Sequence, residues 1–204
     1  MGLTSYYINL LKDHITINYE PFRELDFDNN IIAFFSKDSL ALLCLLDDLS
    51  KMSIKQEIVV LVDDHYHNKA FIRILKKQNI KTYNIDRYKN SKRRYEEIVK
   101  VARKSLLAIC LDGPSGPKLV PKKVLFYLSN SVQKSITLAQ VHYIKKIKLR
   151  FRWDDLVVPL ILPNAEININ FTNIGVTDHQ FINNFVYNRE AFQKVISKKD
   201  QNNW

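Results

Sequence analysis

Short apolar runs alternate with helical patterns along most of this 204-residue chain. Each run is typical of a buried strand, and the residues after it place apolar side chains at helical spacing. The length fits a single domain over residues 1–204. The alternation predicts an α/β fold of three layers, in which helices flank a mixed, mostly parallel sheet. The runs are IIAFF (31–35), EIVVLV (57–62), IKTYNI (80–85), LLAICLD (106–112) and ITLAQVHY (136–143).

The last third of the chain has a different pattern. Apolar and basic residues alternate over 145–152, which predicts a strand with one buried and one cationic face. VVPLILP and AEININF then predict neighbouring strands joined at Pro163-Asn164, and a final helix is expected over about 178–197. The alternating residues are Ile147, Leu149, Phe151 and Trp153 on one side and Lys146, Lys148, Arg150 and Arg152 on the other.

The chain is basic, with 31 Lys plus Arg against 21 Asp plus Glu and a formal net charge of +10. No Asp or Glu occurs from Lys134 to Arg152, which favours contact with an anionic membrane surface, a lipid or phosphate, or an acidic carrier protein. Nucleic acid is the competing electrostatic interpretation, but no zinc-finger or RNP-type pattern supports it. The apolar runs are too short to span a membrane. We therefore expect a cytoplasmic protein in peripheral contact with the inner face of the membrane.

Polar residues follow three of the predicted strands. Ser36 and Asp38 follow the first, the segment 63–68 (DDHYHN) follows the second, and Asp112 opens the hexapeptide DGPSGP after the fourth. Ligands gather beyond the carboxyl ends of parallel strands. We expect the three clusters to face one another there.

The segment 63–68 has three interpretations. Its Asp and Asn residues suit a solvated turn that caps the next helix. His65 or His67 could be a catalytic or acceptor-binding histidine. A metal site of Asp63, Asp64, His65 and His67 lacks a third segment that supplies ligands, and we predict no metal.

The hexapeptide is either a rigid turn or a preorganised wall of a binding cleft. It lacks the Gly-Lys-Ser/Thr ending of a phosphate-binding loop, and its prolines remove backbone donors. Lys118, just beyond it, could attract an anion. Cys44 and Cys110 lie inside apolar runs and are expected to be buried.

The block LAICLDGPSGPKLVPKKVLFYLSNSVQKSITLAQV resembles the central block of the lysophospholipid acyltransferase superfamily, in its small bacterial branch with the Asp-Gly-Pro-x-Gly-Pro motif. RFRWDDLVVPLILPNAEININF is similar to the family's Ser-Trp-Asp, Pro-Leu-Pro and final strand. The resemblance covers about 30–172 and implies a glycerol-3-phosphate-acyltransferase-like core.

The resemblance implies a histidine base that takes the proton of an acceptor hydroxyl as it attacks the thioester of coenzyme A or acyl carrier protein. In this sequence the family histidine falls on Ser36, and the family Asp-Gly falls on His67-Asn68. The arginine of the hexapeptide is Ser115, and only Arg87 could replace an Arg-Gly pair. The chain thus resembles an atypical member of the family that lacks the usual catalytic histidine.

Two accounts follow from the resemblance. The chain transfers a fatty acyl group from acyl-CoA or acyl carrier protein to a lipid or small amphipathic acceptor, with His67 or His65 as the base and Asp38 orienting it. The alternative is a non-catalytic acyl-binding, lipid-binding or accessory protein.

Ser36 as an acylated nucleophile is a further possibility, without a nucleophile-elbow pattern around it. No permanently bound cofactor is expected. The expected catalytic residues are His67, His65, Asp38 and Ser36. The expected substrate-binding residues are Asp112, Gly113, Pro114, Ser115, Gly116, Arg87, Lys118, Lys146, Lys148 and Arg150.

Overall fold

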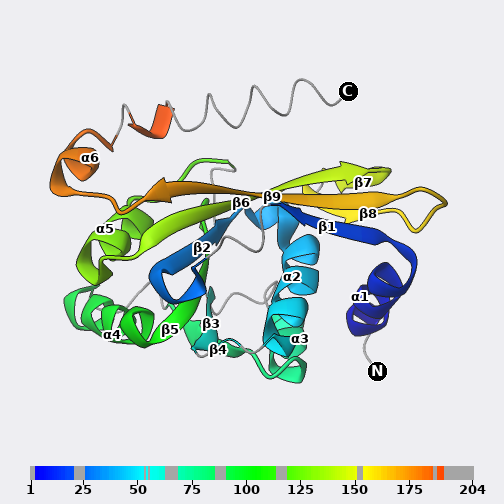
Figure 1. Cartoon of the computed structure of the whole chain (residues 1–204), viewed down its shortest axis with the longest axis horizontal. Helices are drawn as coiled ribbons and strands as arrows, with labels where there is room; N and C mark the ends of the chain where they lie inside the picture. Colours follow the sequence, from blue (N-terminus) through cyan, green and yellow to red (C-terminus); the bar gives the residue numbers. More distant parts are fainter. Residues whose placement is uncertain are drawn as a thin grey trace.

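A seven-stranded sheet forms the middle layer of the computed structural model (Figure 1). The model describes residues 3–20, 26–52, 54, 56–62, 69–85, 91–113, 119–150, 154–185 and 188–190. The strand order is β1-β9-β6-β2-β5-β3-β4. The strands are β1 (Thr16–Glu20), β2 (Asn30–Phe34), β3 (Glu57–Val62), β4 (Lys81–Asn84), β5 (Ser105–Cys110), β6 (Ser135–Ile144) and β9 (Glu166–Gly175).

Most of this sheet is parallel. β6, β2, β5, β3 and β4 run in one direction, whereas β9 is antiparallel to β6 and β1 is parallel to β9. The prediction of a mixed, mostly parallel α/β sheet is confirmed.

Helices cover both faces of the sheet (Figure 1). α1, α2 and α3 contribute to the core on one face, and α4, α5 and α6 contribute to the core on the other. The helices are α1 (Leu3–His14), α2 (Ser39–Lys51), α3 (Lys69–Lys77), α4 (Ser91–Lys104), α5 (Lys123–Val132) and α6 (His179–Asn183), with short 3-10 helices η1 (Phe27–Asn29) and η2 (Ser36–Asp38).

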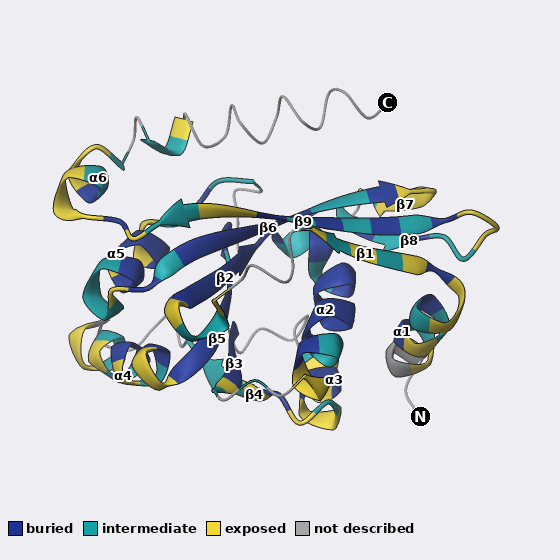
Figure 2. Cartoon of the chain, viewed as in Figure 1, coloured by how far each residue is buried: buried dark blue, intermediate teal, exposed yellow. Residues whose placement is uncertain are grey.

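The central strands explain this arrangement. All residues of β2 are buried, with Ile32 and Phe34 in one core and Ile31 and Ala33 in the other. A strand that is apolar on both faces is stable only where both faces are covered, which requires helices above and below the sheet. Figure 2 shows this burial along the middle of the sheet.

The prediction for the last third needs two corrections. β7 (Lys146–Leu149) and β8 (Leu156–Pro159) form a separate two-stranded antiparallel sheet, named here the β7–β8 ribbon. β8 pairs with β7, whereas β9 pairs with β6 and β1, so the prediction that VVPLILP and AEININF are neighbours is wrong. Periodicity identifies a strand but does not specify its partner.

The predicted buried face of the basic strand is also wrong. Ile147 is 49% exposed and Leu149 is half-buried, while Phe151 and Trp153 lie outside the described residues. Lys146, Lys148 and Arg150 are exposed, as expected for a cationic surface.

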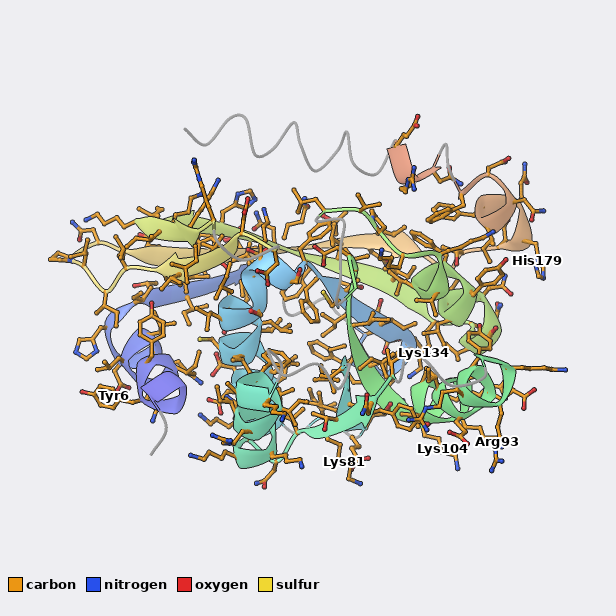
Figure 3. The ribbon with its side chains drawn as sticks, turned by 180° about the vertical axis from the view of Figure 1, so that it is seen from behind. Tyr6, Lys81, Arg93, Lys104, Lys134 and His179 are labelled. Atoms are coloured by element: carbon orange, nitrogen blue, oxygen red, sulfur yellow. The ribbon has the colours of Figure 1, made fainter. Side chains whose placement is uncertain are left out.

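Lys134 does not belong to that surface. It is 5% exposed, and its ammonium donates to the Ser105 carbonyl at 2.8 Å and to Gln56 Oε1 at 3.1 Å (Figure 3). This buried lysine joins residues at the amino ends of β3, β5 and β6, so its role there is structural.

The two ends of the chain differ from the prediction. The sequence patterns did not indicate α1 or β1, an edge strand whose burial alternates from exposed to intermediate. Within the predicted final helix, about 178–197, the structure describes α6 and the helical residues 188–190. Residues 191–204 lie outside the described residues.

An ion-pair network fastens α1 to α2. The Lys12 ammonium binds the carboxylates of Asp47 and Asp48, and the Tyr19 hydroxyl donates to Asp48 Oδ2 at 2.5 Å. Lys51 also binds Asp47, at 2.6 Å, but the Lys51 side chain is 66% exposed, against 19% for Lys12. Burial acts to raise the pKa of Asp47, but hydrogen bonds and charge from Lys12 and Lys51 outweigh it, so this pKa lies below its usual value.

We expect Lys12→Met to lower the free energy of unfolding by about 1–3 kcal/mol at neutral pH, because two shielded carboxylates lose their partner. Lys51→Met removes an exposed pair and should cost less than about 0.5 kcal/mol. Urea unfolding measures both.

The same pair of variants tests pH dependence. A carboxylate with a lowered pKa in the folded state stabilises the fold above its unfolded pKa, and this stabilisation is lost as the pH falls through the folded pKa. The difference in the free energy of unfolding between wild type and Lys12→Met should therefore become smaller below about pH 4. Equal losses in the two variants, or a gap independent of pH, would refute this role for Lys12.

Candidate functional site

The Asp112 carboxylate, just beyond β5, links two of the predicted polar clusters. Its Oδ1 accepts hydrogen bonds from the Ser36 backbone N–H at 3.1 Å, the Ser36 hydroxyl at 2.9 Å and the Cys110 thiol at 3.0 Å. Its Oδ2 accepts from the Leu119 N–H at 3.1 Å. Asp112 is 1% exposed, so these donors replace water around a buried carboxylate. Ser36, Cys110, Asp112 and Leu119 are named here the Asp112 cluster.

Strand register explains why Ser36 meets Asp112. β2 and β5 are parallel neighbours, with Phe34 opposite Cys110, and the Leu111 N–H continues the ladder to the Phe34 carbonyl at 2.7 Å. Ser36 and Asp112 each follow the paired residue by two positions, so they arrive together at the carboxyl edge. The predicted convergence is confirmed for these two clusters, and the third, 63–68, lies outside the described residues.

The Asp112 cluster also closes the base of the hexapeptide loop. The Lys122 N–H donates to the Leu111 carbonyl at 2.8 Å, beside the bond from Leu119 to Asp112. Gly113 has a φ of +63°, and a Cβ there would lie 3.2 Å from Cγ and Cε of Lys122. Glycine therefore suits both the backbone and the close Lys122 stem at this position.

Asp38 belongs to a second buried pair at the same edge. It precedes α2 as the N-cap residue, but its side chain does not cap the helix. Asp38 Oδ1 instead accepts from the Tyr143 hydroxyl of β6 at 3.0 Å, and the two residues are 2% and 9% exposed. Burial raises the pKa of Tyr143 well above its usual value, and the charge and hydrogen bond of Asp38 raise it further.

The structure places the other predicted site residues in two groups. Lys146 and Lys148 lie on β7, and Arg150 directly follows it; the partner strand β8 packs against η2 and α2. The remainder lie outside the described residues: His65, His67, Arg87, Pro114, Ser115, Gly116 and Lys118.

Sequence patterns did not assign the roles of Cys110 and Tyr143. Cys110 was expected to act as a small apolar residue, yet its thiol donates to Asp112. The sequence does carry a signal for this contact. Cys110 and Asp112 are two residues apart, and side chains at that spacing in an extended segment lie on one face. Burial raises the pKa of the Cys110 thiol well above its usual value, as do the charge and hydrogen bond of Asp112, so the thiol stays protonated. Tyr143 lies 105 residues from Asp38, and no local pattern pairs them.

His142 is a further candidate at this edge. β6 pairs Leu138 with Ala33 of β2, and His142 lies four residues further along β6, beyond the end of β2. Successive side chains of a strand point to opposite faces, so His142 faces away from the Tyr143–Asp38 pair. The other described histidines, His14 and His179, lie on α1 and α6.

The described residues at this edge can bind and orient a substrate. None of them is identified as a general base. A serine hydroxyl is no base near neutral pH, and the Ser36 hydroxyl donates a hydrogen bond to Asp112. Among the described residues, no three His, Cys, Asp or Glu side chains gather as metal ligands, and no helix has the length and apolar character to cross a membrane.

No family model matches the chain, and no curated protein and no solved structure matches it either.

We expect Asp112→Asn to lower the free energy of unfolding by about 1–3 kcal/mol, because an amide N–H₂ would face one of the buried donors around Asp112. Asp178→Asn is the matched control. Asp178 caps α6 by accepting from the Phe181 N–H at 2.6 Å, and asparagine caps a helix as well as aspartate does. Chemical denaturation compares the two, and equal stability of both variants would show that the Asp112 cluster does not hold the edge together.

Proposed function

We propose that this chain is an acyltransferase-like protein with a rearranged active site at the carboxyl edge of β2 and β5. It transfers a fatty acyl group from acyl-CoA or acyl carrier protein to a hydroxyl of a lipid or small amphipathic acceptor. The contact between Ser36 and Asp112 carries the proposal. It joins the position where the resemblance expects the catalytic base to the hexapeptide where it expects the substrate.

The reaction needs a general base, and no described residue at this edge is identified as one. His67 and His65 are the proposed bases, since they follow β3, which pairs with β5 on the side away from β2. The base takes the proton of the acceptor hydroxyl, whose oxygen attacks the thioester carbonyl. The C–S bond then breaks, and the leaving thiolate takes the proton back from the base.

The acidic residues of the edge hold the geometry in this scheme. Asp112 fixes the position of Ser36, and Asp38 is bonded to Tyr143, so an orienting role for Asp38 would involve the pair as a unit. Gly113 and the stem of Lys122 form the described base of the loop that would border the substrate.

A second candidate function is non-catalytic binding of an acyl chain or lipid. One observation favours it: the Ser36 hydroxyl and Asp38 both use hydrogen bonds within the protein, to Asp112 and Tyr143. Such a site would keep the shape of an acyltransferase cleft without its proton transfer.

The first test follows loss of acyl-CoA or acyl carrier protein thioester in the presence of a lysophospholipid. We expect His67→Ala or His65→Ala to lower kcat roughly a hundredfold or more, the usual contribution of a general base. His142→Ala tests the described histidine of the edge, and His179→Ala, exposed on α6, is the control. Turnover unchanged in the first three variants would exclude a histidine base.

The second test restores a base. Ser36→His puts an imidazole beside Asp112, whose Oδ1 lies 2.9 Å from the Ser36 hydroxyl, and we expect turnover to rise roughly tenfold or more. Ser50→His, on the exposed end of α2, is the control. A wild type that binds acyl-CoA without turnover, together with a gain in Ser36→His, supports the binding protein. If the wild type neither turns over nor binds acyl-CoA, and the folded Ser36→His variant shows no turnover either, both functions are refuted.

A further inference from the structure

One face of three neighbouring strands, β1, β9 and the carboxyl half of β6, is polar (Figure 1). Ile167, Ile169 and Phe171 of β9 belong to the core on the other face, so the residues between them point to this one. The register continues the polar face across all three strands in two rows, with β9 in the middle. The six residues are Asn18, Asn168 and His142 in one row and Glu20, Asn170 and Gln140 in the next, and they are named here the amide face.

The amide face begins beside the Asp112 cluster. Leu138 of β6 lies opposite Ala33 of β2, so Gln140, two residues further on, is level with the residue before Ser36. Gln140 is 8% exposed, the members on β9 are half-buried, and the members on the edge strand β1 are exposed. A ligand on this face would therefore extend from the solvent-exposed edge of the sheet to the candidate site.

Hydrogen bonds orient two of the amides. Asn18 Nδ2 donates to Asn168 Oδ1 at 2.8 Å, and the Thr172 hydroxyl donates to Gln140 Oε1 at 3.1 Å. Each bond fixes the plane of an amide whose N–H₂ group is a donor and whose oxygen is an acceptor. Asn168 and Gln140 lie on adjacent strands in adjacent rows, so the face is preorganised for several hydrogen bonds at once.

The asparagines of this face are unfavourable for strands. Asn is depleted in β-strands, where β-branched and aromatic residues are preferred. Yet Asn168 and Asn170 hold successive positions on this face of β9, an internal strand, and Asn18 lies opposite Asn168. A sheet face that met only water would be more stable with threonine at these positions, so the amides indicate hydrogen bonding to a ligand.

The charge of the face restricts the kind of ligand. β1, β9 and residues 140–144 of β6 contain no Lys or Arg, although the chain carries a formal net charge of +10. Glu20 belongs to the face and Glu166 flanks it on β9, so a phosphate or carboxylate would be repelled. Among the described residues, no three His, Cys, Asp or Glu side chains gather as metal ligands. Hydroxyl groups both donate and accept, and they match amides and carboxylates without requiring a charge.

We infer that the amide face binds an uncharged ligand with several hydroxyl groups, a carbohydrate. The inference rests on the proposed function where it assigns this carbohydrate as the head group of the acyl acceptor, with the reacting hydroxyl near Ser36. Binding itself requires no turnover, so carbohydrate binding and acyl transfer are separately measurable.

The experiment is saturation-transfer NMR of the full chain with the methyl glycosides of glucose, galactose, mannose and N-acetylglucosamine at millimolar concentrations. We expect at least one glycoside to bind, and Asn168→Thr/Asn170→Thr to weaken its binding about tenfold, because two amide hydrogen bonds are lost. Threonine suits strands, so this variant should keep its fold. Asn9→Thr/Asn183→Thr makes the same change at exposed residues of α1 and α6 and should bind like wild type.

The outcomes separate the inference from the proposed function. No binding of any glycoside by wild type, equal loss in both double variants, or binding of inorganic phosphate that depends on Asn168 and Asn170 would overturn the inference. Glycoside binding without loss of thioester supports the carbohydrate site and counts only against acyl transfer. If both occur, Asn168→Thr/Asn170→Thr should raise KM for an alkyl glycoside acceptor and leave kcat unchanged.

Discussion

The parallel pairing of β2 with β5 is the interaction on which the rest of the structure depends. Both strands are buried along nearly their whole length, so helices must cover both faces of the sheet. Their register also brings Ser36, two positions after Phe34, next to Asp112, two positions after Cys110. One pairing thus sets the three-layer architecture and assembles the Asp112 cluster.

Buried carboxylates make the carboxyl edge rigid. Asp112 and Asp38 are 1% and 2% exposed, and a buried carboxylate is stable only where hydrogen bonds replace water. Asp112 receives donors from the ends of β2 and β5 and from the return of the hexapeptide loop, and Asp38 receives a donor from β6. Both proposed functions, acyl transfer and acyl binding, use an edge that these bonds hold in place.

The charge excess of the chain has a definite distribution in the structure. Lys134, which the sequence groups with the basic strand, is buried and joins strand ends, whereas Lys145, Lys146, Lys148 and Arg150 are exposed on or next to β7. β8 packs against η2, so the ribbon and the candidate site are neighbours in the fold.

The sequence by itself determined the strands and helices between 30 and 144, the α/β class and the meeting of Ser36 with Asp112, because periodicity and strand order report burial and direction. Tertiary structure decided that β8 pairs with β7 and β9 with β6, that Ile147 faces outward, and that Tyr143 binds Asp38. Alternation along one strand shows that its two faces differ. It does not show which face is covered or which strand lies beside it, because residues far away in the chain supply those contacts.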